Sequence, residues 1–74
     1  MVNEASKDEL EREIKIKNAD WDFINKQPPK IRQALILFID TGDEYKAAKL
    51  AGITVDEFEE LRIKAKIPKV TFID

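Results

Sequence analysis

The stretch from Lys46 to Leu61, KAAKLAGITVDEFEEL, constrains the fold more than any other part of the chain. Gly52 favours a sharp turn, because glycine adopts backbone conformations that other residues avoid. Ala48, four residues before it, is small enough to let two helices touch, and Phe58 follows six residues after it. Further apolar residues stand at the other positions expected to face inward: Ala47, Ala51, Ile53 and Leu61. This spacing predicts two helices that cross closely at a glycine turn.

Capping signals frame both of these helices. Asp43 precedes the first helix, and Thr54 with Glu57 three residues later forms a capping box at the start of the second. Pro68 requires the second helix to end by about residue 67. We therefore predict a helix-turn-helix over about residues 43–66. The alternative is an ordinary helical hairpin whose turn contains glycine.

A largely apolar helix is predicted just before this unit, over residues 30–40. Pro29 suits its first turn, and Gly42 suits a left-handed cap at its end. Its apolar residues leave little polar surface, so the helix is expected at the centre of the core or against a partner. Together with strand-like segments at 13–17 and 69–73, it leads us to expect a homodimer.

The first twelve residues are polar, and the sequence leaves their structure open. Ser6 and Glu9 fit a capping box for a short helix over residues 7–12, whereas the composition equally fits a mobile tail. Beyond them, residues 13–17 alternate isoleucine with lysine, the period of a half-buried strand. A helical reading competes, because Leu10, Ile14, Trp21 and Ile24 recur at helical spacings. The strand is preferred, followed by a short helix capped near Asp20.

The closing segment KVTFID alternates apolar and polar residues and predicts a second strand over 69–73. The expected fold class is therefore mainly α: one small helix-turn-helix domain over 13–74 with short strand-like segments, preceded by a polar segment over 1–12. Seventy-four residues leave room for a single core.

Composition excludes several classes of function. The chain has no cysteine and no histidine, which removes disulfides, thiolate chemistry, most zinc sites and imidazole catalysis. No nucleotide-binding or nucleophile motif is present, so neither an enzyme nor a bound cofactor or metal is expected. No apolar run is long enough to span a bilayer and no signal peptide opens the chain, which predicts a cytoplasmic protein. Abundant Lys, Glu and Ile hint at a thermophilic source.

Charge decides which part of the chain could meet double-stranded DNA. Charged residues make up 38% of the chain but nearly cancel at a net −2, so any attraction to DNA must be local. In a helix-turn-helix the second helix enters the major groove, and lysines and arginines bind the flanking phosphates. The predicted DNA-contacting residues are Thr54, Val55, Arg62, Lys64, Lys66, Lys69, Lys46 and Lys49. A solvated basic surface is the alternative reading of the lysines.

Acidic residues on the second helix argue for a different partner. Carboxylates near a helix N-terminus stabilise it, which explains part of the pattern. The same charges would repel a duplex, and no Arg, Lys, Asn or Gln stands beside them at the start of the helix. The sequence therefore also predicts a protein-binding surface made of Asp56, Glu59, Glu60 and Ile63.

The run from Ile31 to Asp74 resembles a family of small prokaryotic, archaeal-type helix-turn-helix proteins. The resemblance rests on an apolar helix, Gly42, the run KAAKLAGIT, and EFEELRIKAKIP before a short strand. Members are antitoxin-like, and some are encoded beside PIN-domain toxins. The resemblance implies a compact regulator that binds its own operator, a toxin, or both, and that approaches DNA through Thr54, Val55 and Asp56.

Overall fold

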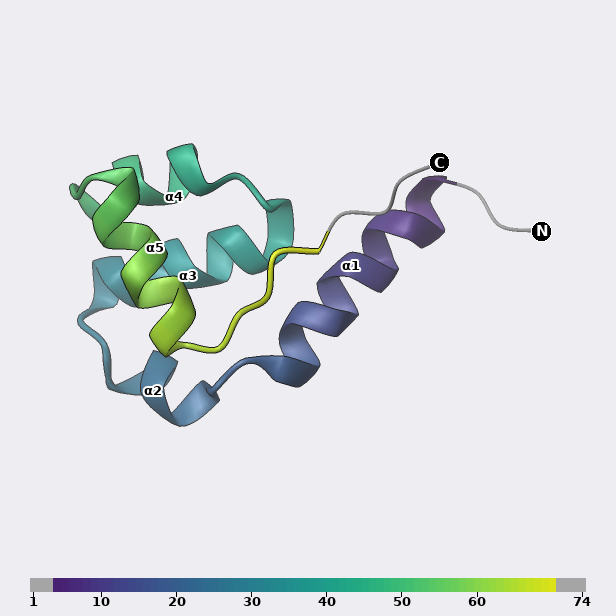
Figure 1. The fold of residues 1–74 in the computed structure, drawn as a ribbon, viewed down its shortest axis with the longest axis horizontal. Coiled ribbons are helices and arrows are strands. Elements are labelled where there is room, and N and C mark those ends of the chain that lie inside the picture. Colours follow the sequence, from purple (N-terminus) through teal and green to yellow (C-terminus); the bar gives the residue numbers. More distant parts are fainter. Residues whose placement is uncertain (1–3, 71–74) are drawn as a thin grey trace.

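In a computed structural model, residues 4–70 are described, and this part of the chain is mainly helical (Figure 1). Side chains are described from Glu9 onward. The helices are α1 (Glu4–Asn18), α2 (Trp21–Lys26), α3 (Pro29–Thr41), α4 (Glu44–Ala51) and α5 (Val55–Lys64). No helix within these residues is both long and apolar enough to cross a membrane.

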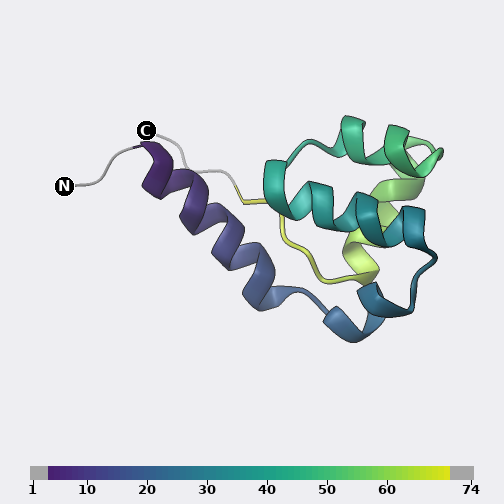
Figure 2. The same ribbon diagram turned by 180° about the vertical axis from the view of Figure 1, so that it is seen from behind.

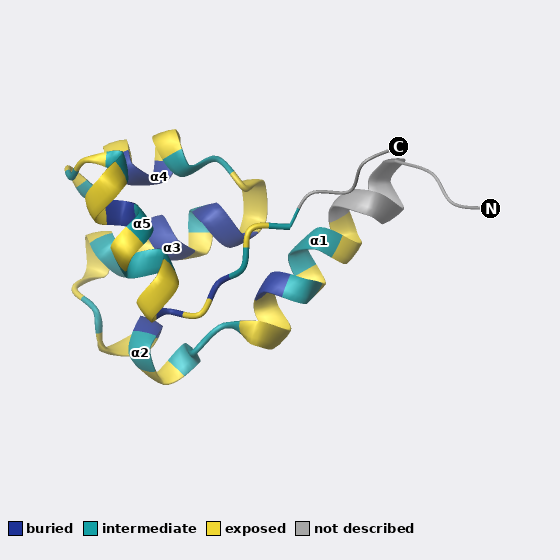
Figure 3. Cartoon of the chain, in the orientation of Figure 1, coloured by how far each residue is buried: buried dark blue, intermediate teal, exposed yellow. Residues whose placement is uncertain are grey.

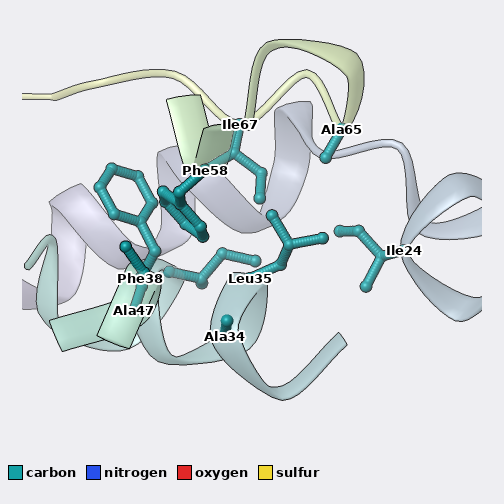
Figure 4. Packing of buried hydrophobic residues seen from close by; sticks show 10 residues of the cluster. Ile24, Ala34, Leu35, Phe38, Ala47, Phe58, Ala65 and Ile67 are labelled. Atoms are coloured by element: carbon teal, nitrogen blue, oxygen red, sulfur yellow. The ribbon is translucent and has the colours of Figure 1, made fainter. Parts of the chain in front are cut away.

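Helix α3 lies at the centre, as its apolar composition predicted. Its residues Ala34, Leu35, Phe38 and Ile39 are buried, and α4 and α5 pack beside it (Figure 3). Figure 4 shows Phe38 and Phe58 side by side, with ring centroids 5.7 Å apart and planes tilted by 55°. Tilted aromatic pairs of this kind add stabilisation beyond the area they bury. The core therefore joins α3 to the α4–α5 pair.

The predicted caps and turns of the α3–α5 region are confirmed. Gly42 and Gly52 have left-handed backbones, with φ of 72° and 71°, which explains glycine at both positions. The Asp43 carboxylate accepts the backbone N–H of Lys46 at 3.0 Å. Thr54 and Glu57 exchange both hydrogen bonds of a capping box, at 2.9 and 3.1 Å. Local sequence signals therefore mark both ends of α4 and the start of α5.

The strand predicted over 13–17 is wrong, because these residues continue α1 to Asn18. The helix starts at Glu4, ahead of the capping box predicted at Ser6. Of the helical stripe weighed against the strand, Ile24 on α2 is buried and Leu10 is exposed, whereas the buried residue described on α1 is Lys15. Within residues 4–70 there is no strand that could pair with this segment, whereas a helix satisfies its own backbone. The short helix after Asp20 is confirmed as α2.

The second predicted strand, 69–73, lies largely outside the described residues. Its first two residues, Lys69 and Val70, belong to neither a helix nor a strand. Before them the chain turns back over the core: Ala65 and Ile67 are buried, and the Ala65 carbonyl accepts the backbone N–H of Asp20 at 2.7 Å. This returning segment brings residues 65–70 beside the helices.

Helix α1 extends away from the other helices and joins them through its last turns (Figures 1 and 2). The Lys15 amine is buried and donates to the carbonyls of Phe38 and Ile39 at 3.4 and 3.3 Å, over the Phe38 ring. A cation at these carbonyls suits the negative end of α3. Burial nevertheless lowers the pKa of Lys15 from its ordinary value. The attachment of α1 to α3 is thus mainly polar.

Candidate functional site

The outer side of α5 carries acidic, apolar and basic residues in order along its length. We call the exposed residues of this side the α5 face: Asp56, Glu57, Glu60, Ile63 and Lys64. They recur at helical spacing, opposite the buried Phe58. Ile63 is 64% exposed, the most exposed large aliphatic side chain described. The α5 face is therefore acidic for two turns and then apolar and basic.

Two residues at the start of α5 differ in accessibility. Thr54 is exposed, but its hydroxyl accepts the backbone N–H of Glu57, which orients it as a cap. Val55 is partly buried and packs against the core. Of the predicted contacts at this end of the helix, Thr54 is open to a ligand and Val55 is largely a packing residue.

Three predicted site residues, Glu59, Arg62 and Lys69, form an ion-pair network. Arg62 binds Glu59 at 2.9 Å and donates to the Ile67 carbonyl at 2.7 Å. Lys69 binds Glu59 at 2.9 Å and also Glu44, on α4, at 3.2 Å. The network therefore fastens the returning segment to both α4 and α5. The expectation that Glu59 faces outward is corrected by these contacts.

The charges of this network stabilise one another. Burial of Glu59 acts to raise the pKa of its carboxyl, but hydrogen bonds from Arg62 and Lys69 outweigh burial and lower the pKa to about 2. Hydrogen bonds to Glu59 and Glu44 raise the pKa of the Lys69 amine. Only 23% of the Glu59 side chain is exposed, so water screens the network only partly. Arg62, only 14% exposed, is consequently held within the fold, whereas Lys69 is paired but remains 51% exposed.

The remaining predicted cations are exposed on two elements. Lys46 and Lys49 lie on α4 beside the exposed ring of Tyr45. Lys64 ends α5, and Lys66 follows with a left-handed backbone, φ 57°. Such a conformation is uncommon for a residue with a side chain. With Lys69, which is paired but 51% exposed, five of the six predicted basic residues are exposed, and Arg62 is the one that is not.

A small cavity opens near the attachment of α1. Its volume is about 220 Å³, and its lining includes Lys15, Phe38, Glu44 and Lys69. The Lys15 amine already faces the α3 carbonyls, and Lys69 is paired with carboxylates. No group of three or more metal-ligating side chains is found within the described part of the chain. The cavity therefore offers no uncommitted charge to hold an ionic ligand.

The Glu59–Arg62–Lys69 network was not predicted from the sequence, although one of its pairs has a local signal. Glu59 and Arg62 are three residues apart on one helix, a spacing at which opposite charges pair. Nothing local identifies Lys69 as the third member, because its position depends on how residues 65–68 turn back. Lys15 likewise gives no sequence signal of its burial.

Comparison of the chain with protein-family models, with curated proteins and with solved structures gave no match.

Proposed function

We propose that this chain is a small helix-turn-helix regulator, antitoxin-like, that binds double-stranded DNA in the cytoplasm. The observation that carries the proposal is the α4–α5 unit: two helices crossing at a glycine turn, with lysines exposed on α4 and at the end of α5. Small residues at the crossing and an outward second helix are what major-groove docking requires. The resemblance of residues 31–74 to such regulators supports the same function.

The exposed lysines would supply the affinity. We expect Lys46 and Lys49 on α4 to contact phosphates on one side of a groove, and Lys64 and Lys66 to contact phosphates on the other. Phosphate contacts orient a protein on DNA but carry no direct sequence information. The carboxylates of Asp56 and Glu60, on the side of α5 that would face the groove, would oppose binding. Weak, strongly salt-dependent binding with little sequence preference is therefore expected.

A duplex titration tests this proposal. Binding of a labelled random 20-base-pair duplex is measured by fluorescence anisotropy from low to physiological salt. If three or four lysines contact phosphate, log affinity falls against log salt with a slope of about −3. Replacing both Lys46→Glu and Lys49→Glu should reduce affinity at least about tenfold, because two contacts become repulsions.

The matched control carries the same charge change elsewhere: Lys26→Glu with Lys30→Glu, two exposed lysines on α2 and α3. This control should bind the duplex with an affinity within a few-fold of that of the unmodified chain. If both double variants lost affinity equally, only net charge would matter. Neutralising Asp56→Asn and Glu60→Gln should strengthen binding if α5 enters the groove. Absence of binding at low salt would reject the proposal.

A second function is favoured by the α5 face itself. Ile63 is exposed and follows Asp56 and Glu60 along one side of the helix. Protein interfaces commonly have an apolar centre bordered by a polar rim. We propose as the alternative a protein-interaction module whose partner presents an apolar pocket bordered by lysines or arginines.

The alternative is tested by placing a photoreactive amino acid at position 63 and, as control, at the exposed position 33 on α3. A partner of the stated chemistry should cross-link at 63 and not at 33. Adding Asp56→Lys and Glu60→Lys should abolish the adduct, because the charges then repel. Cross-linking that survives this charge reversal, or that is equal at both positions, would contradict a specific interface on the α5 face.

A further inference from the structure

The outer side of helix α4 combines an aromatic ring with two lysines. Tyr45 is 70% exposed, the largest exposure of any large apolar side chain among the described residues. Lys49 follows it by one helical turn on the same side, and Lys46 lies beside Lys49. The opposite side of the helix, with Ala47 and Ala48, is buried in the core. We call the exposed residues Tyr45, Lys46 and Lys49 the α4 face.

The lysines of the α4 face have no carboxylate partner in the described part of the chain. Neither Lys46 nor Lys49 takes part in an ion pair within residues 9–70. The carboxylates at the start of α4 are engaged elsewhere: Glu44 binds Lys69, and Asp43 accepts the backbone N–H of Lys46. The α4 face is therefore positive, whereas the first two turns of the α5 face are acidic, and its charge suits a polyanion.

We propose that the α4 face binds single-stranded nucleic acid, with a base stacked on the Tyr45 ring and the adjacent phosphates bound by Lys46 and Lys49. Proteins that bind single strands combine positive charge along the backbone with exposed aromatic rings on which bases stack. An unpaired base offers its flat face to such a ring, whereas a base within a duplex is already stacked on its neighbours. The exposed ring of Tyr45 therefore favours a single strand over a duplex.

The acidic residues of α5 favour the same ligand. A duplex that takes α5 into its major groove must pass close to Asp56 and Glu60, whose charges repel it. A single strand is narrower and can lie along α4 without entering that region. The inference shares Lys46 and Lys49 with the proposed function, but it does not require groove docking.

Helix α4 holds this face in one place. Asp43 caps its start, Gly52 ends it, and its buried alanines pack against the core. The helix lies at an edge of the molecule, with its exposed side directed outward (Figures 1 and 3). A face that is already ordered loses little conformational entropy when a ligand binds.

Fluorescence anisotropy at low salt compares three labelled probes: a thymidylate 20-mer, a uridylate 20-mer and the random 20-base-pair duplex. The full chain should bind the single strands more tightly than the duplex, and the tighter of the two strands identifies the ligand as DNA or RNA. Tyr45→Ala should weaken single-strand binding at least about fivefold, and Tyr45→Phe, which keeps the ring, should bind within about twofold of the unmodified chain. The matched control is Ile36→Ala, which removes an exposed apolar side chain from α3 and should leave the affinity unchanged.

An abasic strand of the same length, which carries the phosphates without the bases, isolates the stacking contact. The unmodified chain should bind it at least about fivefold less tightly than the thymidylate strand. Tyr45→Ala should bind the two strands equally, because it has no ring on which a base could stack. Lys46→Glu with Lys49→Glu should weaken the binding of both strands, because phosphates are common to them.

Two results would overturn the inference: no binding of either single strand at low salt, or equal affinity of Tyr45→Ala and the unmodified chain. Circular dichroism of every variant verifies that its helices are retained. Single-strand binding without duplex binding would reject groove docking alone. Duplex binding together with single-strand binding that does not depend on Tyr45 would reject the stacking site alone.

Discussion

Replacing Phe58 with alanine is expected to remove between about a third and nearly all of the free energy of unfolding at 25 °C. The Phe58 side chain is fully buried and packs against Phe38 at the junction of α3 with α5. Removing a buried phenylalanine costs about 3–5 kcal/mol, through lost burial and the cavity that remains. A domain of this size is stable by only about 4–11 kcal/mol. Urea denaturation followed by circular dichroism measures the loss.

Ile63→Ala is the matched control, since it removes an apolar side chain from the same helix at an exposed position. Its effect on the free energy of unfolding should stay within about 0.5 kcal/mol. Both variants should be denatured at a protein concentration of about 1 µM or below, because self-association then adds little to the free energy of unfolding. A loss of less than about 1 kcal/mol for Phe58→Ala would contradict the central position of this ring in the core.

The sequence predicted the α3–α5 region because its signals are local. Gly42, Gly52 and the Thr54–Glu57 capping box fix helix ends whatever the rest of the chain does. Apolar spacing then identified Phe58 and the alanines of α4 as inward-facing. The secondary structure of residues 13–17 could not be predicted in this way. Their local pattern fits a strand and a helix alike, and the burial of Lys15 at the end of α3 carries no apolar signal in the sequence.

The candidate site was predictable only for residues whose exposure follows from helix periodicity. Asp56, Glu60 and Ile63 lie on the outer side of α5, as their spacing predicted. Arg62 and Lys69 were predicted from charge alone as phosphate contacts. Their pairing with Glu59 depends on the returning segment, whose path is set by burial of Ile67 and the backbone turn at Lys66. The charge of Arg62 and Lys69 shows that they can bind an anion, but it does not show whether that anion is a phosphate or a carboxylate of the same chain.

Neutralising Glu59 should remove a large ionic contribution to the stability of the fold. The Glu59→Gln variant keeps the size of the side chain but loses both charge-assisted contacts, to Arg62 and Lys69. Because the pKa of Glu59 falls from 4.5 to about 2 on folding, the charged form is the one that stabilises the folded state. At pH 7 the variant should lose about 1–3 kcal/mol, the range set by about 1.4 kcal/mol per pKa unit and partial solvent screening.

The lowered pKa of Glu59 in the folded state also determines how the free energy of unfolding depends on pH. The contribution of Glu59 is fully present above pH 4.5, the pKa of its unfolded form, and is lost as pH falls toward about 2. Urea denaturation at pH 7, 4 and 2.5 should therefore show the unmodified chain and Glu59→Gln converging in acid. Glu60→Gln, the neighbouring exposed carboxylate, should follow the unmodified chain at every pH. If Glu59→Gln stayed parallel to the unmodified chain down to pH 2.5, the network would not hold residues 65–70 against α4 and α5, and Arg62 and Lys69 would again be available to phosphate.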